Sequence, residues 1–162
     1  MSSADLRCGR GRVGATSRLL AVALATLALA ACGDSPVELE VIEEITFDAS
    51  LDIDLADFTE LPSGVYIQDV TEGTGDVIQV GSAYTMSYVG WLRTGAEFDA
   101  GTVSFVYGGG AIPGWELGIQ GMLEGGVRRL IIPPGLAYGE EGSGPVPGGA
   151  VLIFRVQLIV VG

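Results

Sequence analysis

The chain of 162 residues contains no histidine and no lysine, and its only cysteines are Cys8 and Cys32. These absences exclude a histidine-based catalytic triad, a Cys-His dyad and a Schiff-base lysine. They also exclude a zinc site with the usual histidine and cysteine ligands. The sequence therefore predicts neither a metal nor a cofactor, and any catalysis has to use other residue types.

Positive charge is scarce as well. Four of the eight arginines lie before residue 19, and the rest of the chain carries only Arg93, Arg128, Arg129 and Arg155. The net charge is −12. A chain this acidic repels phosphate backbones, so we expect no nucleic-acid partner.

Residues 1–31 have the pattern of an export signal. Arginines lead into an uncharged run from Leu19 to Ala31, which is shorter than the ~20 apolar residues of a membrane-spanning helix. The run ends in Leu29-Ala30-Ala31-Cys32, which resembles the bacterial lipobox. This resemblance implies a lipid on Cys32 and an exported protein anchored to a membrane, facing the periplasm or the cell surface. An ordinary signal followed by a chance or buried cysteine is the alternative.

Residues 32–61 are strongly acidic, with ten carboxylates and no basic residue between positions 33 and 60. This composition is typical of a solvated tether. However, Leu51, Ile53 and Leu55 alternate with aspartates, which predicts an added edge strand lying on the domain. Both interpretations stay open from the sequence alone.

Residues 62–162 have short apolar runs separated by glycine-rich turns, which predicts one domain rich in antiparallel strands. We expect strands around residues 65–70, 83–92, 103–107, 127–132 and 150–160. The last run has the clearest pattern, because apolar residues occupy every second position while Arg155 and Gln157 fall on the other face.

One helix is expected between the third and fourth of these strands. Pro113 suits a first helical position, and Trp115, Ile119 and Met122 follow at i, i+4 and i+7. A lone short helix can bury its apolar face only against the sheet. The sequence therefore predicts an α+β fold in which a curved sheet surrounds one short helix.

Aromatic and apolar residues gather at strand ends and in loops. For each one alone, packing in the core is the commoner role. These residues are Tyr88, Phe98, Ile112, Trp115, Tyr138, Val146 and Phe154. Their neighbourhoods form ordered blocks, namely Tyr88-Val89-Gly90, Gly95 to Asp99, Ile112 to Glu116, Pro133 to Gly139, and Leu152 to Phe154.

In the order and spacing of these blocks, residues 64–160 resemble the FKBP family of peptidyl-prolyl isomerases. The resemblance implies a five- or six-stranded antiparallel curved sheet wrapped around one short helix, with a site in the hollow between them. It also implies isomerisation of Xaa-Pro bonds in proline-containing polypeptides, and binding of tacrolimus-like macrolides. Without turnover, the same pocket would serve a proline-binding chaperone or assembly factor.

The resemblance also implies roles for single residues. Trp115 would lie under the proline ring as a platform, Tyr88, Phe98 and Phe154 would form walls, and Asp99 would lie at the edge of the pocket. The N–H of Ile112 and the hydroxyl of Tyr138 would donate hydrogen bonds to substrate carbonyls. Val146 would match an apolar substrate-binding residue in the loop before the last strand.

Two further expected substrate-binding positions depart from the family pattern. Val103 stands where family members often carry a phenylalanine, and Ala111 stands where they usually carry a valine. Both side chains are smaller than the usual ones. We therefore expect a thinner wall on this side of the pocket and weaker macrolide binding.

Overall fold

The computed structural model describes residues 39–162. The expected signal sequence, Cys32 with its expected lipid, and residues 33–38 lie outside the described residues. No helix among residues 39–162 is long and apolar enough to cross a membrane.

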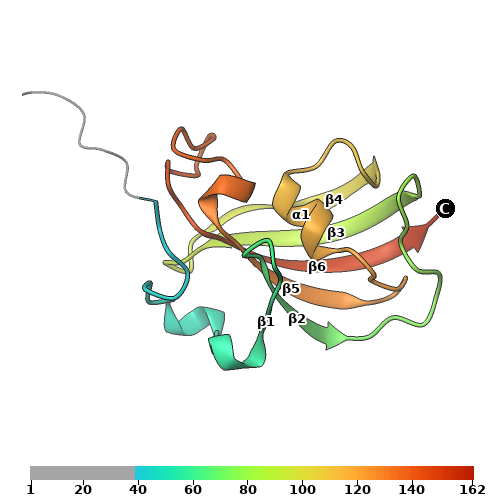
Figure 1. Cartoon of the computed structure of the whole chain (residues 1–162), viewed down its shortest axis with the longest axis horizontal. Coiled ribbons are helices and arrows are strands. Elements are labelled where there is room, and N and C mark those ends of the chain that lie inside the picture. Colours follow the sequence, from blue (N-terminus) through green and yellow to red (C-terminus); the bar gives the residue numbers. More distant parts are fainter. Residues whose placement is uncertain (1–38) are drawn as a thin grey trace, which may run out of the picture. The chain divides into compact units, whose positions relative to one another are not determined.

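Six strands form one sheet, in which all neighbouring strands are antiparallel (Figure 1). The strands are β1 (Thr59–Glu60), β2 (Tyr66–Thr71), β3 (Ala83–Leu92), β4 (Glu97–Val106), β5 (Val127–Ile132) and β6 (Leu152–Val161). Their order across the sheet is β1-β2-β5-β6-β3-β4. The predicted α+β class, with an antiparallel sheet around one short helix, is confirmed.

Strand β4 begins six residues earlier than the sequence predicted. It pairs with β3 from Ala83 opposite Val106 to Gly90 opposite Asp99, and the register shifts only after Gly90. The small residues Ala100 and Gly101 did not indicate a strand in the sequence. Pairing with β3 along its length overrides their weak β propensity. As a result, Phe98 and Asp99 are held in the sheet rather than in a free turn.

The helix α1 (Pro113–Gly118) lies against the sheet (Figure 1). Two of its glycines allow a very close approach. A Cβ atom added to Gly114 would lie 2.2 Å from Cγ2 of Ile132, and one added to Gly118 would lie 2.8 Å from Cδ2 of Leu130. Any larger side chain at these positions would push the helix away from β5.

The helix ends after six residues, before the predicted Met122. Arg128 on β5 holds the C-terminal end of the helix. The Arg128 guanidinium donates to the carbonyls of Gly118 (2.8 Å) and Gln120 (3.2 Å), and it also pairs with both oxygens of Asp69. A cation at this end satisfies carbonyls that lack partners within the helix.

The two faces of the sheet bury two separate apolar clusters. The larger cluster lies between the sheet and α1 and includes Trp115, Phe154 and Leu158. The second cluster lies on the outer face, where Ile131 and Ile153 are almost fully buried. An outer face is normally solvated in an antiparallel sheet, so this burial needs a covering segment.

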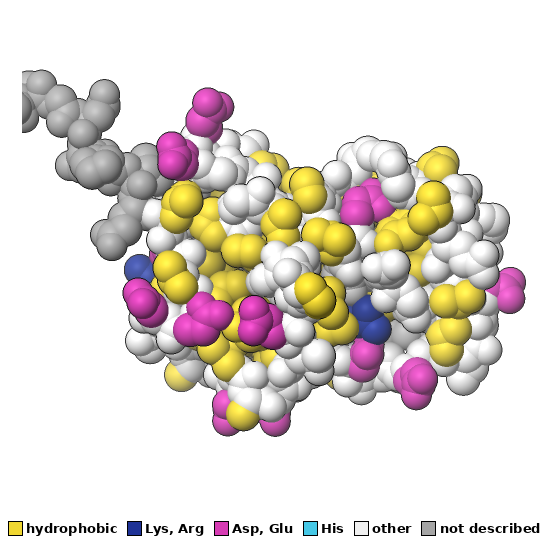
Figure 2. Space-filling model, viewed as in Figure 1, with side chains coloured by type: hydrophobic (Ala, Val, Ile, Leu, Met, Phe, Trp, Pro, Cys, Tyr) yellow, Lys and Arg dark blue, Asp and Glu magenta, His cyan; other side chains and the backbone are white. Residues whose placement is uncertain are grey.

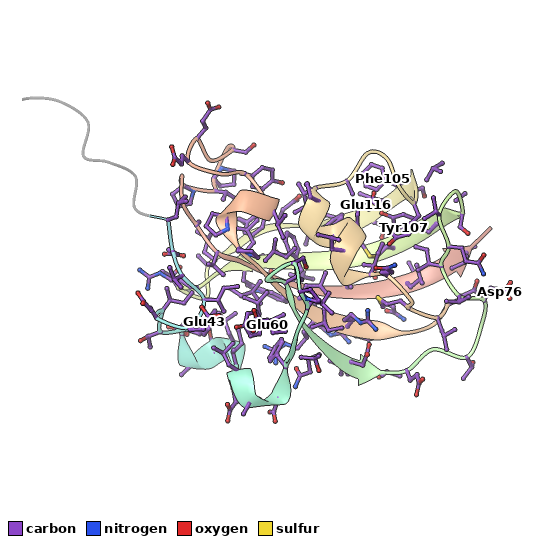
Figure 3. The ribbon with its side chains drawn as sticks, viewed as in Figure 1. Glu43, Glu60, Asp76, Phe105, Tyr107 and Glu116 are labelled. Atoms are coloured by element: carbon purple, nitrogen blue, oxygen red, sulfur yellow. The ribbon has the colours of Figure 1, made fainter. Side chains whose placement is uncertain are left out.

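The covering segment is residues 39–61, which we call the arm. Ile42 and Leu51 pack in the same cluster as Tyr66, Ile131 and Ile153. The hydroxyl of Tyr66 donates to Glu43, whose side chain lies near that of Glu60 in the view of Figure 3. Residues 39–61 are therefore part of the folded domain instead of a solvated tether.

The alternation of Leu51, Ile53 and Leu55 does not form a strand. The segment folds into two 3-10 turns, η1 (Ala49–Leu51) and η2 (Leu55–Asp57), and the added edge strand is the two-residue β1. The side chain of Asp48 accepts from the Ser50 N–H (2.9 Å), and that of Asp54 accepts from the Ala56 N–H (3.0 Å). Aspartate favours such local caps over an extended ladder.

Arg129 fastens these turns to the sheet. Its guanidinium donates to the carbonyls of Leu51 and Asp52 and lies 5.5 Å from the ring centroid of Phe58. Burial lowers the pKa of Arg129. The guanidinium nevertheless stays charged, because arginine starts from a pKa above 12.

We predict that Leu51→Ala lowers the free energy of unfolding by about 2–3 kcal/mol, because it leaves a cavity beside the outer sheet face. Chemical denaturation of residues 33–162 measures this change. Leu39→Ala is the matched control, because Leu39 is 43% exposed and the same substitution there should cost under about 0.5 kcal/mol. A Leu51→Ala variant that loses no more stability than Leu39→Ala would contradict the packing of Leu51 against the outer sheet face.

Candidate functional site

A pocket of about 200 Å³ opens between α1, the sheet and the segment around Tyr138. Figure 2 shows hydrophobic side chains exposed on the face that carries α1. The pocket is lined by Tyr88, Phe98, Asp99, Val103, Phe105, Gly110, Ala111, Ile112, Trp115, Tyr138 and Phe154. Most of these side chains are aromatic or aliphatic, as is usual for small-molecule and peptide sites.

Four aromatic rings form the base and one side of this pocket. The centroid of Trp115 lies 4.8 Å from that of Tyr88 and 5.1 Å from that of Phe154, with interplanar angles of 65° and 78°. Phe98 packs edge-on against Phe154 at 5.6 Å. Edge-to-face packing of this kind fixes each ring through its neighbours. The rings therefore form a preorganised apolar surface.

Gly90 on β3 makes room for these rings. A Cβ atom at this position would lie 2.7 Å from both Phe154 and Phe98. The backbone of Gly90 is not in a left-handed conformation, so the need for glycine is one of space. The sequence showed Gly90 in a block with Tyr88, but the need for glycine at this position is visible only in the packing of the rings.

Two polar groups at the rim interact with each other. The hydroxyl of Tyr88 donates to Oδ2 of Asp99 across the β3–β4 pair, at 2.7 Å. This hydrogen bond to a carboxylate, followed by burial, raises the pKa of Tyr88 to about 12. The phenol therefore stays neutral and keeps its proton on the Asp99 side at ordinary pH.

Two donors lie free at the other side of the pocket. Tyr138 is 37% exposed, and its hydroxyl has no hydrogen-bond partner among residues 39–162. The N–H of Ile112, just before α1, likewise has no acceptor within the described part of the chain. Both residues line the pocket, so both donors are available to a bound group.

The loop that leads to Ile112 is held by the residue after Trp115. Glu116 accepts the N–H of Gly108 at 2.9 Å through its carboxylate, and its backbone carbonyl accepts the hydroxyl of Tyr107 at 2.9 Å. Figure 3 shows Tyr107, Glu116 and Phe105 grouped at this end of α1. The helix thereby positions both the Trp115 ring and the loop from Gly108 to Ile112.

The structure brings nine of the ten predicted pocket residues together and leaves one out. Val146 does not line the pocket, because it is 5% exposed and packs in the larger cluster. A tight turn in which Ser143 and Val146 exchange two backbone hydrogen bonds directs Val146 inward. Phe105 and Gly110 also line the pocket although the sequence did not indicate them, and they lie in the stretch from Val103 to Ala111, where the chain departs from the family pattern.

A second hollow of about 530 Å³ lies at the far ends of β3, β4 and β6. It is lined by backbone and side chains around Tyr84, Ser104 and Gly162, and Phe105 is its only residue in common with the aromatic pocket. Within residues 39–162, no three carboxylate or thiol side chains gather where they could hold a metal ion. The aromatic pocket is therefore the site with the better-defined set of binding groups.

Comparisons with known proteins agree on this region. Residues 75–159 match the family model described as FKBP-type peptidyl-prolyl cis-trans isomerase. The chain is 45% identical over 111 residues to an FK506-binding protein of Streptomyces anulatus, in an alignment that covers 63% of this chain and 90% of that protein. It is 43% identical to FK506-binding protein 4 of Rhizopus delemar, but the alignment covers 62% of this chain and only 28% of that longer protein.

Solved structures give the same result for the fold. A peptidyl-prolyl cis-trans isomerase of Pseudomonas syringae is 33% identical with a TM-score of 0.61, and the match covers 65% of this chain and 81% of that one. FkpA of Escherichia coli is 34% identical with the same TM-score, and 51% of its chain is covered. The shared part is therefore a domain that occurs both nearly alone and within longer chains.

We predict that Gly90→Ala destabilises the domain by about 1–3 kcal/mol, because the added methyl group overpacks the contact with Phe154 and Phe98. Thermal unfolding followed by circular dichroism measures this effect. Gly101→Ala on β4 is the control, since its Cβ atom would meet Tyr88 at an ordinary 3.6 Å. A Gly90→Ala variant as stable as Gly101→Ala would contradict the packing of these rings.

Proposed function

Because the chain belongs to the FKBP-type peptidyl-prolyl cis-trans isomerase family, we propose that it isomerises Xaa-Pro bonds of exported polypeptides in the aromatic pocket, without covalent chemistry. Its role would be to accelerate a folding step that otherwise takes tens to hundreds of seconds. The observation that carries this proposal is the preorganised ring surface around Trp115.

Rotation about a peptide bond faces a barrier of ~18–20 kcal/mol, because resonance gives the C–N bond double-bond character. The planar amide is more charge-separated than the twisted amide. An apolar pocket therefore favours the twisted form, which is the form that resembles the transition state. No proton has to move in this reaction, which fits a pocket without histidine, lysine or cysteine.

The proline ring would lie on Trp115, with Phe154 and Phe98 beside it. The hydroxyl of Tyr138 and the N–H of Ile112 would donate to the flanking substrate carbonyls. Holding these carbonyls fixed lets the proline ring turn relative to them, so the donors act by orientation. The small side chains of Val103 and Ala111 would leave room at the edge, which supports weaker binding of bulky tacrolimus-like macrolides.

The site of action would be the bacterial periplasm or the cell surface, with Cys32 as the lipid anchor in a membrane. Glu40 lies eight residues after Cys32, and its N–H donates to the carbonyl of Gly149 in the domain. Eight residues span at most roughly 28 Å when fully extended. The arm would therefore shorten the tether and keep the domain within about that distance of the lipid.

Exchange spectroscopy on an Xaa-Pro peptide tests the main proposal. We expect residues 33–162 to accelerate cis/trans interconversion at catalytic concentration. A chain whose peptide resonances shift on binding, but whose interconversion rate does not rise, would instead be a proline-binding chaperone. Absence of both effects would overturn the proposed function.

Two substitutions separate the donor from the platform. Tyr138→Phe should lower the isomerisation rate about 3- to 10-fold, the value of one hydrogen bond, with little change in stability because Tyr138 is partly exposed. Trp115→Ala should abolish most activity and also cost about 3–5 kcal/mol of stability, because the ring is buried. Paired rate and denaturation measurements check both, and unchanged activity in Trp115→Ala would exclude the platform role.

The isomerisation rate should be nearly constant between pH 6 and 8. The chain has no histidine, the side chain that ordinarily titrates in this range, and the raised pKa of Tyr88, about 12, keeps its phenol neutral. A bell-shaped profile of the rate centred near pH 7 would contradict this mechanism.

The contribution of Tyr88 to the stability of the domain should depend on pH only in the alkaline range. Because the folded pKa of Tyr88 lies above the ordinary value near 10, its contribution to stability is complete below pH 10 and is lost as the pH rises toward 12.

A further inference from the structure

Glu40, near the start of the arm, contacts two segments that are far apart in the sequence. Its N–H donates to the carbonyl of Gly149 at 2.9 Å, and its Oε2 accepts the N–H of Val151 at 2.9 Å. Its Oε1 accepts the Nε–H of Arg93 in an ion pair. The Glu40 side chain is only 23% exposed, so these bonds are partly shielded from water.

The first segment is the loop that follows Tyr138. The N–H of Gly149 donates to the carbonyl of Gly139 at 2.8 Å, and the N–H of Gly139 donates to the carbonyl of Pro134 at 2.9 Å. These bonds close the base of the loop directly beside Tyr138. Glu40 therefore binds the same residue, Gly149, that fixes the backbone next to the Tyr138 donor.

This loop is rich in glycine. Residues 139–149 include five glycines, and four of them, Gly139, Gly142, Gly144 and Gly149, have positive φ angles. Glycine loses more conformational freedom on ordering than any other residue. Contacts from outside the loop therefore contribute to its ordering, and Glu40 supplies one at Gly149 and another at Val151, two residues beyond the loop.

The second segment is the turn from residue 93 to 96, which joins β3 to β4. Arg93 is held there by Glu40, and its carbonyl accepts the N–H of Asp48, also in the arm, at 2.8 Å. The turn leads directly to Phe98 and Asp99 at the start of β4, which line the pocket. Glu40 therefore links the two segments that carry two sides of the pocket. Its N–H bonds Gly149 at the end of the loop, and its carboxylate bonds Val151, two residues further on, and Arg93 in the turn.

We propose that Glu40 is a positioning residue, which holds the loop of residues 139–149 and the β3–β4 turn in the arrangement that the aromatic pocket needs. This inference rests on the isomerase activity proposed above. Its energetic basis is the N–H of Val151, which is fully buried and has Glu40 as its acceptor. Loss of the carboxylate leaves that donor unsatisfied, so the end of the loop moves to find another partner.

The test compares Glu40→Ala with Glu43→Ala in residues 33–162. Both remove one arm carboxylate that accepts a hydrogen bond from the domain, but Glu43 binds Tyr66 on β2, away from the pocket-lining residues. We expect Glu40→Ala to lower kcat/KM for an Xaa-Pro peptide about tenfold, because small displacements of positioning groups have large effects on rate. Glu43→Ala should stay within about twofold of the parent.

Glu40→Gln and Arg93→Met separate the ion pair of Glu40 with Arg93 from its hydrogen bond with Val151. The glutamine can still accept from Val151 but loses its charge pairing with Arg93, and the methionine removes the same pairing from the other side. We expect each to lower kcat/KM about threefold, and the double variant to be no worse than either alone, because both break one interaction. Additive losses in the double variant would overturn the link through Arg93.

A readout independent of activity keeps this inference separate from the proposed function. Amide hydrogen exchange should accelerate at least tenfold at Gly149 and Val151 in Glu40→Ala, but not in Glu43→Ala. If the parent chain proves inactive while exchange accelerates as expected, the function fails and the positioning stands. Unchanged exchange at both amides, or equal losses of kcat/KM in the two alanine variants, would overturn the role of Glu40.

Discussion

The close approach of α1 to β5 sets the position of the Trp115 ring in the pocket. Gly114 and Gly118 face Ile132 and Leu130 with no space for a Cβ atom, so the helix lies directly on the sheet. Trp115, between the two glycines, is thereby pressed against the rings of the neighbouring strands. Arg128 holds the other end of the helix through its terminal carbonyls. The depth of the pocket is a consequence of this packing.

The pocket combines a rigid part with an adjustable part. The rings of Trp115, Tyr88 and Phe154 come from the helix and from central strands and lock one another edge-to-face. The expected donors, Ile112 and Tyr138, lie instead outside the regular strands and helix, before α1 and after the 3-10 turn of residues 134–136. Their position is set by side chains from other segments, such as Glu116 at the loop before α1. Rigidity of the donors is thus imposed from outside.

The arm gives the sheet a second buried face, and its acidic residues make structural contacts there instead of only keeping a tether solvated. Several carboxylates of the arm have structural partners, as caps of 3-10 turns or as acceptors for groups of the domain. Three of the four arginines among residues 39–162, Arg93, Arg128 and Arg129, each join segments far apart in the chain. The few cations among residues 39–162 thus serve mainly to connect segments of the fold.

Local periodicity and the ordered blocks predicted most of the strands, the start of the helix and nine of the pocket residues, but not the start of β4 or the end of α1. The sequence by itself could not determine where the arm lies, since the bonds of Arg129 to Leu51 and Asp52 span more than 75 residues. Nor could it place Val146 in the core, which depends on the turn from Ser143 to Val146, or Phe105 in the pocket, which depends on the pairing of β4 with β3. Only the tertiary structure decides contacts that local pattern does not encode.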